Sequence, residues 1–386
     1  MERKFIPLSV PNIKGNELEY VTEAVKDEWV STGGSYIETF EKNVAEYVHV
    51  EKTVAVQSGT AGLHLALIQS GVGLGDEVIT ATLTFIAAVN PIRYVGAEPI
   101  FMDCDDTLCL DPIKVEQFIE EECTFEEGKL INNHSKKHIK AILGVHVFGN
   151  LLDMEKLMNI AAKYNLKFIE DATEALGSYY TDGLYNGQFA GTIGDFGVFS
   201  FNGNKIMTTG GGGMVLAKNK EDLEYVRYLS TQAKDDTLNF IHGDIGYNYR
   251  MTNLQAALGV GQLERLEDFI ATKKTNYHLY KELLESNEKV ELMDFNQNIR
   301  PNYWFYALNI QGDPDIQLLI QKLQSEKIQT RPIWGLIHEQ KPYTDSQSYK
   351  IEKADYYVNH ILNIPCSSNL TQEEVRYVSE CLNELL

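Results

Sequence analysis

The chain of 386 residues lacks three features: a long apolar run, a surplus of positive charge and a paired cysteine motif. No stretch approaches the eighteen or so apolar residues of a membrane helix, so we expect no membrane-spanning segment. The net charge of −21 and the pI near 4.9 argue against non-specific binding to nucleic acid or an anionic membrane. Any phosphate must therefore be held locally.

The five cysteines form no CxxC pair, a pattern that best fits reduced thiols in a cytoplasm. The first residues, MERKFIPLSVPNI, contain no long apolar region after the two basic residues, so they do not resemble a signal peptide. We therefore expect a cytoplasmic protein. The histidines, His338 among them, show no metal-ligand spacing, and no metal site is predicted.

Strand and helix patterns alternate over most of the chain, which predicts an α/β fold with a mostly parallel sheet covered on both faces. Hydrophobic residues at 44% and charged residues at 23% are typical of a soluble globular protein. The predicted strands are 53–56, 77–80, 99–102, the apolar run beginning near 140, 166–169, 196–201 and 214–217.

The second half of the chain predicts a long helix, from the segment after Arg250 to about Lys281, that connects two domains. We place a large domain at 1–260 and a smaller α/β domain at 261–386. Two polar stretches, 121–137 and 230–244, are predicted to be irregular surface segments.

A strand, a turn of small residues and a helix follow one another at 53–68. Ser58, Gly59, Thr60 and Ala61 stand where the helix would begin, and unpaired backbone amides there attract an anion such as phosphate. Small residues also occur at helix starts for capping and packing, so the pattern alone leaves both interpretations open.

Glu170 and Asp171 end the predicted strand at 166–169. Ligands in open α/β sheets bind outside the carboxyl ends of strands, so Asp171 is placed like a ligand group, whereas Glu170 could be the solvated member of the pair. The alternative is that Asp171 caps a following helix.

Lys205 lies between an apolar strand and four consecutive glycines, in the sequence SFNGNKIMTTGGGG. Glycines are placed where the backbone takes positive φ or approaches another group closely. A lysine desolvated there would be a nucleophile toward carbonyls, and the alternative is a solvated loop lysine. The glycine run matches neither GxGxxG nor GxxxxGK[ST], which disfavours a nucleotide hydrolase.

An anion cradle, an acid at a strand end and a lysine before glycines together meet the requirements of pyridoxal phosphate. This cofactor needs a lysine for its aldehyde and a carboxylate on its ring nitrogen, so that the ring can accept electrons.

With these motifs in their order, the chain resembles the DegT/DnrJ/EryC1/StrS sugar aminotransferases over nearly its whole length. The motifs are SGTAGLHLAL (58–67), LTFIAAVNPI (83–92), EDATEALGS (170–178), SFNGNK (200–205) and GYNYRM (246–251). The resemblance implies the aspartate aminotransferase fold, fold type I, with a seven-stranded type of sheet in the large domain and a smaller C-terminal α/β domain.

The resemblance also implies the roles of the cofactor site. Lys205 would be the Schiff-base lysine and proton carrier, and Asp171 would pair with the pyridine nitrogen. Glu174 would lie near the phenolic oxygen and Phe85 would stack on the ring. The phosphate would be held by Gly59, Thr60, Ala61 and Ser200.

Three further residues belong to the expected substrate and subunit contacts. Asn248 matches a family asparagine that reaches the phosphate from the neighbouring subunit, which implies a homodimer with shared active sites. Arg250 is a hypothesis for binding a substrate anion across that interface, and Arg331, with Trp334 nearby, is a weaker candidate.

The implied reaction moves the amino group of glutamate to carbon four of a nucleotide-linked 4-keto-6-deoxy sugar. The motifs SFNGNKIMTTGGGG and GYNYRM are most similar to those of enzymes of bacillosamine and legionaminic acid pathways. UDP-4-keto-6-deoxy-N-acetylglucosamine is therefore the predicted substrate. A dTDP- or GDP-linked keto-hexose is an alternative, as is a non-catalytic pyridoxal phosphate-binding regulatory protein.

Overall fold

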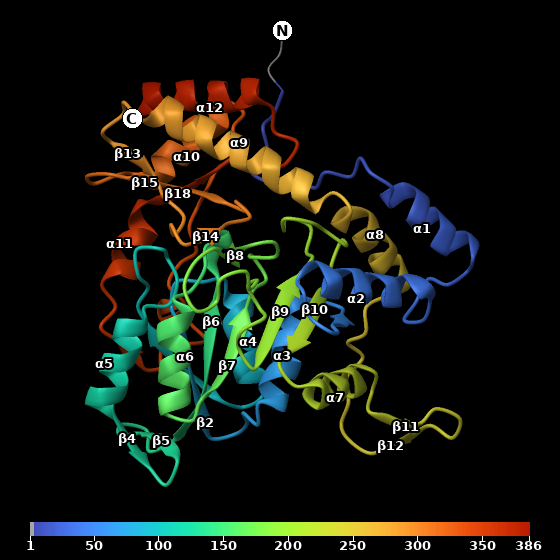
Figure 1. Ribbon diagram of the computed structural model, residues 1–386. Coiled ribbons are helices and arrows are strands. Elements are labelled where there is room, and N and C mark those ends of the chain that lie inside the picture. The colour runs from blue at the N-terminus through green and yellow to red at the C-terminus, as the bar shows by residue number, and fades with distance from the viewer. Residues whose placement is uncertain (1–3) are drawn as a thin grey trace.

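A computed structural model describes residues 4–386, and a mixed, mostly parallel sheet forms its centre (Figure 1). The strand order is β1-β10-β9-β7-β6-β2-β3-β17, and neighbouring strands from β9 to β17 are parallel. β10 runs antiparallel to both β9 and β1. The strands are β1 Val54–Val56, β2 Asp76–Ala81, β3 Glu98–Met102, β6 His138–Val145, β7 Lys167–Asp171, β9 Phe196–Ser200, β10 Gly213–Ala217 and β17 Ser348–Tyr349.

Helices cover both faces of this sheet. α3 packs against β7, β9 and β10 and contacts α4 and α7, whereas α6 packs on β7 beside α5. In Figure 1, α5 and α6 lie in front of the sheet and α3 and α4 behind it. The helices are α1 Glu17–Lys26, α2 Ser35–Tyr47, α3 Gly59–Gln69, α4 Ile86–Tyr94, α5 Pro112–Glu122, α6 Met154–Lys163, α7 Lys220–Ser230, α8 Asn253–Leu263, α9 Leu266–Leu284, α10 Ile316–Ser325, α11 Lys353–His360 and α12 Gln372–Leu385.

Several helices begin at capping residues that the sequence shows. Asp111 accepts from the amide of Ile113 ahead of α5, with Pro112 in the first turn. Thr252 and Gln255 form a capping box at α8, as Thr371 and Glu374 do at α12.

A second sheet, of order β13-β15-β18-β16, lies with α9, α10 and α12 in the C-terminal part of the chain. Its strands are β13 Val290–Leu292, β15 Tyr306–Ile310, β16 Arg331–Pro332 and β18 Ile361–Ile364. β17 comes from the same part of the sequence but joins the central sheet beside β3. The division into domains at 260/261 stays a prediction.

The central sheet has ten strands in the described residues, not the predicted seven. The additional strands are β17 and the hairpin of β4 Cys123–Glu126 and β5 Lys129–Asn132, in which β5 pairs antiparallel with β6. The prediction of an irregular segment at 121–137 was therefore wrong. The segment 230–244 likewise contains a hairpin, β11 Lys234–Asp236 with β12 Ile241–His242.

The predicted long helix ending near Lys281 is two helices, α8 and α9. The backbone leaves helical geometry at Arg265, with φ −110° and ψ 1°. Both helices bury apolar side chains, so the sequence pattern continues across the break.

Two short 3-10 turns, η1 Val147–Gly149 and η2 Ile337–Glu339, and a small pairing of β8 Tyr179–Tyr180 with β14 Ile299–Arg300 complete the elements used below. Within residues 4–386, no helix is both long and apolar enough to cross a membrane.

Candidate active site

A cavity of about 360 Å³ opens where β7 and β9 end and α3 begins. Its wall combines polar groups from these elements with aromatic rings from the C-terminal part of the chain. The lining residues include Ser58, Gly59, Thr60, Thr84, Phe85, Asp171, Thr173, Glu174, Ser200, Asn202, Lys205, Trp304, Phe305 and Trp334. The structure therefore brings together most of the predicted cofactor residues.

The start of α3, where the anion cradle was predicted, lies on the wall of the cavity. Ser58 Oγ accepts the amide hydrogen of Ala61 at 3.1 Å, and Gly59 and Thr60, in the first turn, line the cavity. A Cβ on Gly59 would lie 2.9 Å from Thr173 Cγ2, so only glycine fits. The first amides of a helix have no intrahelical acceptor, which makes such a position suited to an anion such as phosphate. Ala61, the next residue, is buried and does not line the cavity.

Asp171 is 2% exposed at the carboxyl end of β7. Its Oδ1 accepts the amide hydrogen of Thr173 at 3.0 Å. Burial raises the pKa of this carboxyl, an effect that the Thr173 hydrogen bond and the charge of Lys205 oppose. The next helix along the chain is α7, so Asp171 is not a helix cap. A cationic ring nitrogen in the cavity would stabilise the ionised form.

Glu170 is fully buried, so the interpretation of it as a solvated side chain was wrong. Its oxygens accept amide hydrogens from Gly191, Ile193 and Gly194 at 2.6–2.8 Å, and Oε2 lies 2.9 Å from His146 Nε2. The other ring nitrogen of His146 accepts from a backbone amide, so Nε2 carries the hydrogen and donates to Glu170. This side chain ties the loop after β8 to β7.

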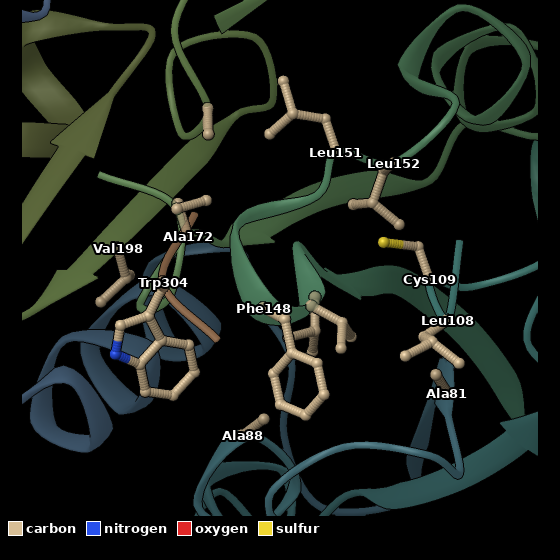
Figure 2. Close-up of a cluster of buried hydrophobic side chains, with 14 of the residues drawn as sticks. Ala81, Ala88, Leu108, Cys109, Phe148, Leu151, Leu152, Ala172, Val198 and Trp304 are labelled. Atoms are coloured by element: carbon tan, nitrogen blue, oxygen red, sulfur yellow. The ribbon is translucent and has the colours of Figure 1, made fainter. Parts of the chain in front are cut away.

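Lys205 is not a solvated loop lysine, since its side chain is 12% exposed. Its Nζ lies 3.4 Å from Glu174 Oε1 and 4.1 Å from the centre of the Trp304 ring. Figure 2 shows Trp304 beside Phe148, with the two rings projecting to the same side. The centres of the two rings are 6.1 Å apart. The amine is thus held between a carboxylate and an aromatic face.

Glu174 is 3% exposed, and its Oε2 accepts the amide hydrogen of Phe148 at 2.9 Å. Burial raises the pKa of this carboxyl to about 7, although the charge of Lys205 acts in the opposite direction. Phe85, at the start of α4, is 51% exposed and lies at the mouth of the cavity.

Three predicted residues do not reach the cavity within one chain. Asn248 is exposed and accepts a hydrogen bond from Gln232 Nε2 at 3.1 Å. Arg250 Nη1 lies 3.2 Å from Glu41 Oε1, and Arg331 is exposed on β16. Their roles stay predictions.

Trp304, Phe305 and Thr84 line the cavity but were not predicted. Trp304 and Phe305 lie about a hundred residues beyond Lys205, in an apolar segment whose pattern is typical of a buried core. Only tertiary packing brings them to the cavity. Thr84 falls within the motif LTFIAAVNPI, but neither its charge nor its spacing indicated a site residue.

The cavity fits pyridoxal phosphate on three observations. The helix start suits its phosphate, and the Asp171 carboxylate suits its ring nitrogen. Thr84 lines the cavity, and its buried hydroxyl has no hydrogen-bond partner among residues 4–386, which is unusual for a buried polar atom and consistent with a group that binds a ligand. The fold and this site are those of a pyridoxal phosphate aminotransferase.

The chain belongs to the DegT/DnrJ/EryC1/StrS aminotransferase family, which it matches over residues 11–383. It is 37% identical to GDP-perosamine synthase of Escherichia coli O157:H7, covering 99% of this chain and 98% of that one. Identity to UDP-4-amino-4,6-dideoxy-N-acetyl-beta-L-altrosamine transaminase of Campylobacter jejuni is 27%, over 99% and 97% of the two chains. The pyridoxal phosphate form of Spr1654 from Streptococcus pneumoniae superposes with a TM-score of 0.89 at 25% identity, over 99% and 98%.

These comparisons confirm the predicted family, the fold and the class of enzyme, a nucleotide-sugar aminotransferase with pyridoxal phosphate as cofactor. They do not test the individual site residues or the choice of nucleotide.

Proposed function

We propose that the protein transfers the amino group of glutamate to carbon four of a nucleotide-linked 4-keto-6-deoxy sugar. One observation carries the proposal. The cavity holds Lys205, Asp171 and the start of α3 together, and these supply the amine, the carboxylate and the phosphate cradle that the cofactor requires.

When bound, pyridoxal phosphate supplies an aldehyde that accepts an amine and a ring that accepts electrons. The residues of the chain hold and orient it. Gly59, Thr60 and Ser200 would bind the phosphate, and Asp171 the ring nitrogen. Lys205 would bind the aldehyde carbon and afterwards carry a proton at Nζ. Phe85 would cover the ring at the mouth of the cavity.

The nucleotide is proposed from similarity. UDP-4-keto-6-deoxy-N-acetylglucosamine was predicted from motif wording, but the relative named for a GDP-linked product is more similar, at 37%, than the relative named for a UDP-linked sugar, at 27%. We therefore place a GDP-linked keto-sugar first and the UDP-linked sugar second.

The glutamate donor and the homodimer are parts of the same proposal. Lys205 is the one lysine or arginine that lines the cavity in the described chain, although glutamate and a nucleotide diphosphate both carry negative charge. Asn248 and Arg250 of a neighbouring subunit would supply polar groups, and Arg331 is the candidate from the same chain.

The test is an absorbance titration of the purified protein. Glutamate should change the absorption of the bound cofactor, and one sugar of a panel of GDP-, UDP- and dTDP-linked 4-keto sugars should restore it. Lys205→Ala should lose both responses, whereas Lys218→Ala, at an exposed lysine outside the cavity, should keep them. A bound cofactor that no amino donor changes would support the regulatory alternative instead.

A further inference from the structure

The contact between Lys205 and Glu174 places a second titratable group next to the reactive amine. We propose that Glu174 is the proton acceptor of Lys205. One proton passes from the Lys205 ammonium to Glu174 Oε1, which leaves a neutral amine and a carboxylic acid with no change in net charge. This inference rests on the proposed function, since it concerns how the lysine of that site becomes reactive.

The geometry gives the transfer a short path. Nζ and Oε1 are 3.4 Å apart, and both side chains are almost excluded from water, at 12% and 3% exposure. A proton leaving Lys205 therefore has a nearby acceptor inside the protein.

The backbone of Phe148 holds the acceptor in place. Phe148 has φ 57° and ψ 16°, in the left-handed region that a phenylalanine seldom occupies. This conformation directs its amide hydrogen to Glu174 Oε2, the oxygen that does not face Lys205. Asn302 Nδ2 also donates to the backbone carbonyl of Glu174 at 2.9 Å. Residues in sparsely populated backbone regions cluster at functional sites, so this conformation is consistent with a part in the mechanism.

The surrounding charges keep Glu174 able to accept and release a proton. The charged or titratable groups that act on it are Lys205 after β9, Asp171 on β7 and Cys109 before α5. Burial and Asp171 raise the pKa of Glu174, Lys205 and the Phe148 amide lower it, and the result is about 7. A glutamine side chain at this position would still accept the Phe148 amide hydrogen, but it could not take up a proton.

The test compares wild type with Glu174→Gln, which keeps an acceptor for the Phe148 amide. Cofactor-free protein is labelled with an amine-reactive reagent between pH 6 and 11, and Lys205 modification is measured by mass spectrometry. An adjacent negative charge favours the unreactive ammonium form, so Glu174→Gln should raise the rate of Lys205 labelling at pH 8 severalfold or more. Lys42, which is exposed, is the internal control, and its labelling should not change.

A reciprocal measurement covers the case in which Glu174→Gln does not fold. Because coupling between two titrating groups is mutual, Lys205→Met should keep the Glu174 carboxyl protonated to higher pH, seen as the infrared C=O band of a carboxylic acid. In the active enzyme, Glu174→Gln should slow the reaction with glutamate by about 100-fold or more and remove the acidic limb of its pH profile near 7.

The outcomes separate the two proposals. Equal labelling of Lys205 in wild type and Glu174→Gln, or an unchanged carboxyl band in Lys205→Met, would overturn the acceptor role even if the enzyme is active. Loss of cofactor attachment at Lys205 would instead contradict the proposed function.

Discussion

The indole nitrogen of Trp304 donates a hydrogen bond to the backbone carbonyl of Asn204 at 2.7 Å. Asn204 is the residue before Lys205, and the same indole ring lies against Lys205 Nζ. A single side chain from the C-terminal part of the chain thus fixes both the backbone and the amine of the lysine segment.

Trp304→Phe tests this contact. Phenylalanine keeps an aromatic face but has no donor, so the Asn204 carbonyl loses its partner. We expect a loss of about 1 kcal/mol in the free energy of unfolding, measured in urea, and weaker cofactor binding. Trp29→Phe, at a side chain 61% exposed, should change stability by less than about 0.5 kcal/mol. Equal effects of the two substitutions would contradict the prediction.

The glycine run provides a matched pair of alanine substitutions. A Cβ on Gly213 would lie 2.6 Å from the carbonyl carbon of Ser58 and 2.7 Å from the amide nitrogen of Gly59, whereas the nearest atom to a Cβ on Gly211 is 3.6 Å away. Gly213→Ala must displace the start of α3, so it should cost about 1–3 kcal/mol and weaken cofactor binding severalfold. Gly211→Ala should do neither. Cofactor titration and thermal unfolding measure both; an equally mild Gly213→Ala would rule out the close approach.

Glu174 should make the stability of the cofactor-free protein depend on pH. Its pKa is raised by burial from 4.5 to about 7, so the folded state favours the protonated form. The stability from this group is complete below pH 4.5 and is lost as the pH rises through 7, by on the order of 3 kcal/mol. Relative to Glu174→Gln, wild type should therefore lose stability between pH 5 and 8. Urea unfolding of both proteins at each pH measures the difference between their free energies of unfolding. A difference that does not change between pH 5 and 8 would contradict the prediction.

Asp103 links β3 to α11 through its carboxylate. The two oxygens accept amide hydrogens from Glu352, Lys353 and Ala354 at 2.8–2.9 Å, and the side chain is fully buried. Asp103→Ala should lower the free energy of unfolding by at least about 2 kcal/mol, since buried donors lose their acceptor. Asp106→Asn is the control, because Asp106 is 76% exposed in its pair with Lys353 and should cost less than about 1 kcal/mol.

Much of the fold could be predicted from the order of strands and helices, because apolar spacing and capping residues are local signals. The hairpin of β4 and β5 was missed because its charged strands have little apolar alternation, and pairing with β6 decides its structure. The break at Arg265 was missed because the apolar pattern continues on both sides of it.

The site likewise contains residues that the sequence indicates and one that it does not. Lys205, Asp171 and the residues after Ser58 stand beside glycines or strand ends, so the sequence marks them. The wrong interpretation of Glu170 has a different cause: its partners are amides at 191–194 and the ring of His146, and no local pattern shows them.

β17 pairs with β3 although the two strands are far apart in the sequence. During synthesis, Ser348 and Tyr349 leave the ribosome about 250 residues after β3, which at roughly 5–20 residues per second is some tens of seconds. For that interval β3 is an open strand edge in the nascent chain, able to pair with another polypeptide. The nascent protein is therefore exposed to aggregation at β3, and a truncation before Ser348 would make that exposure permanent.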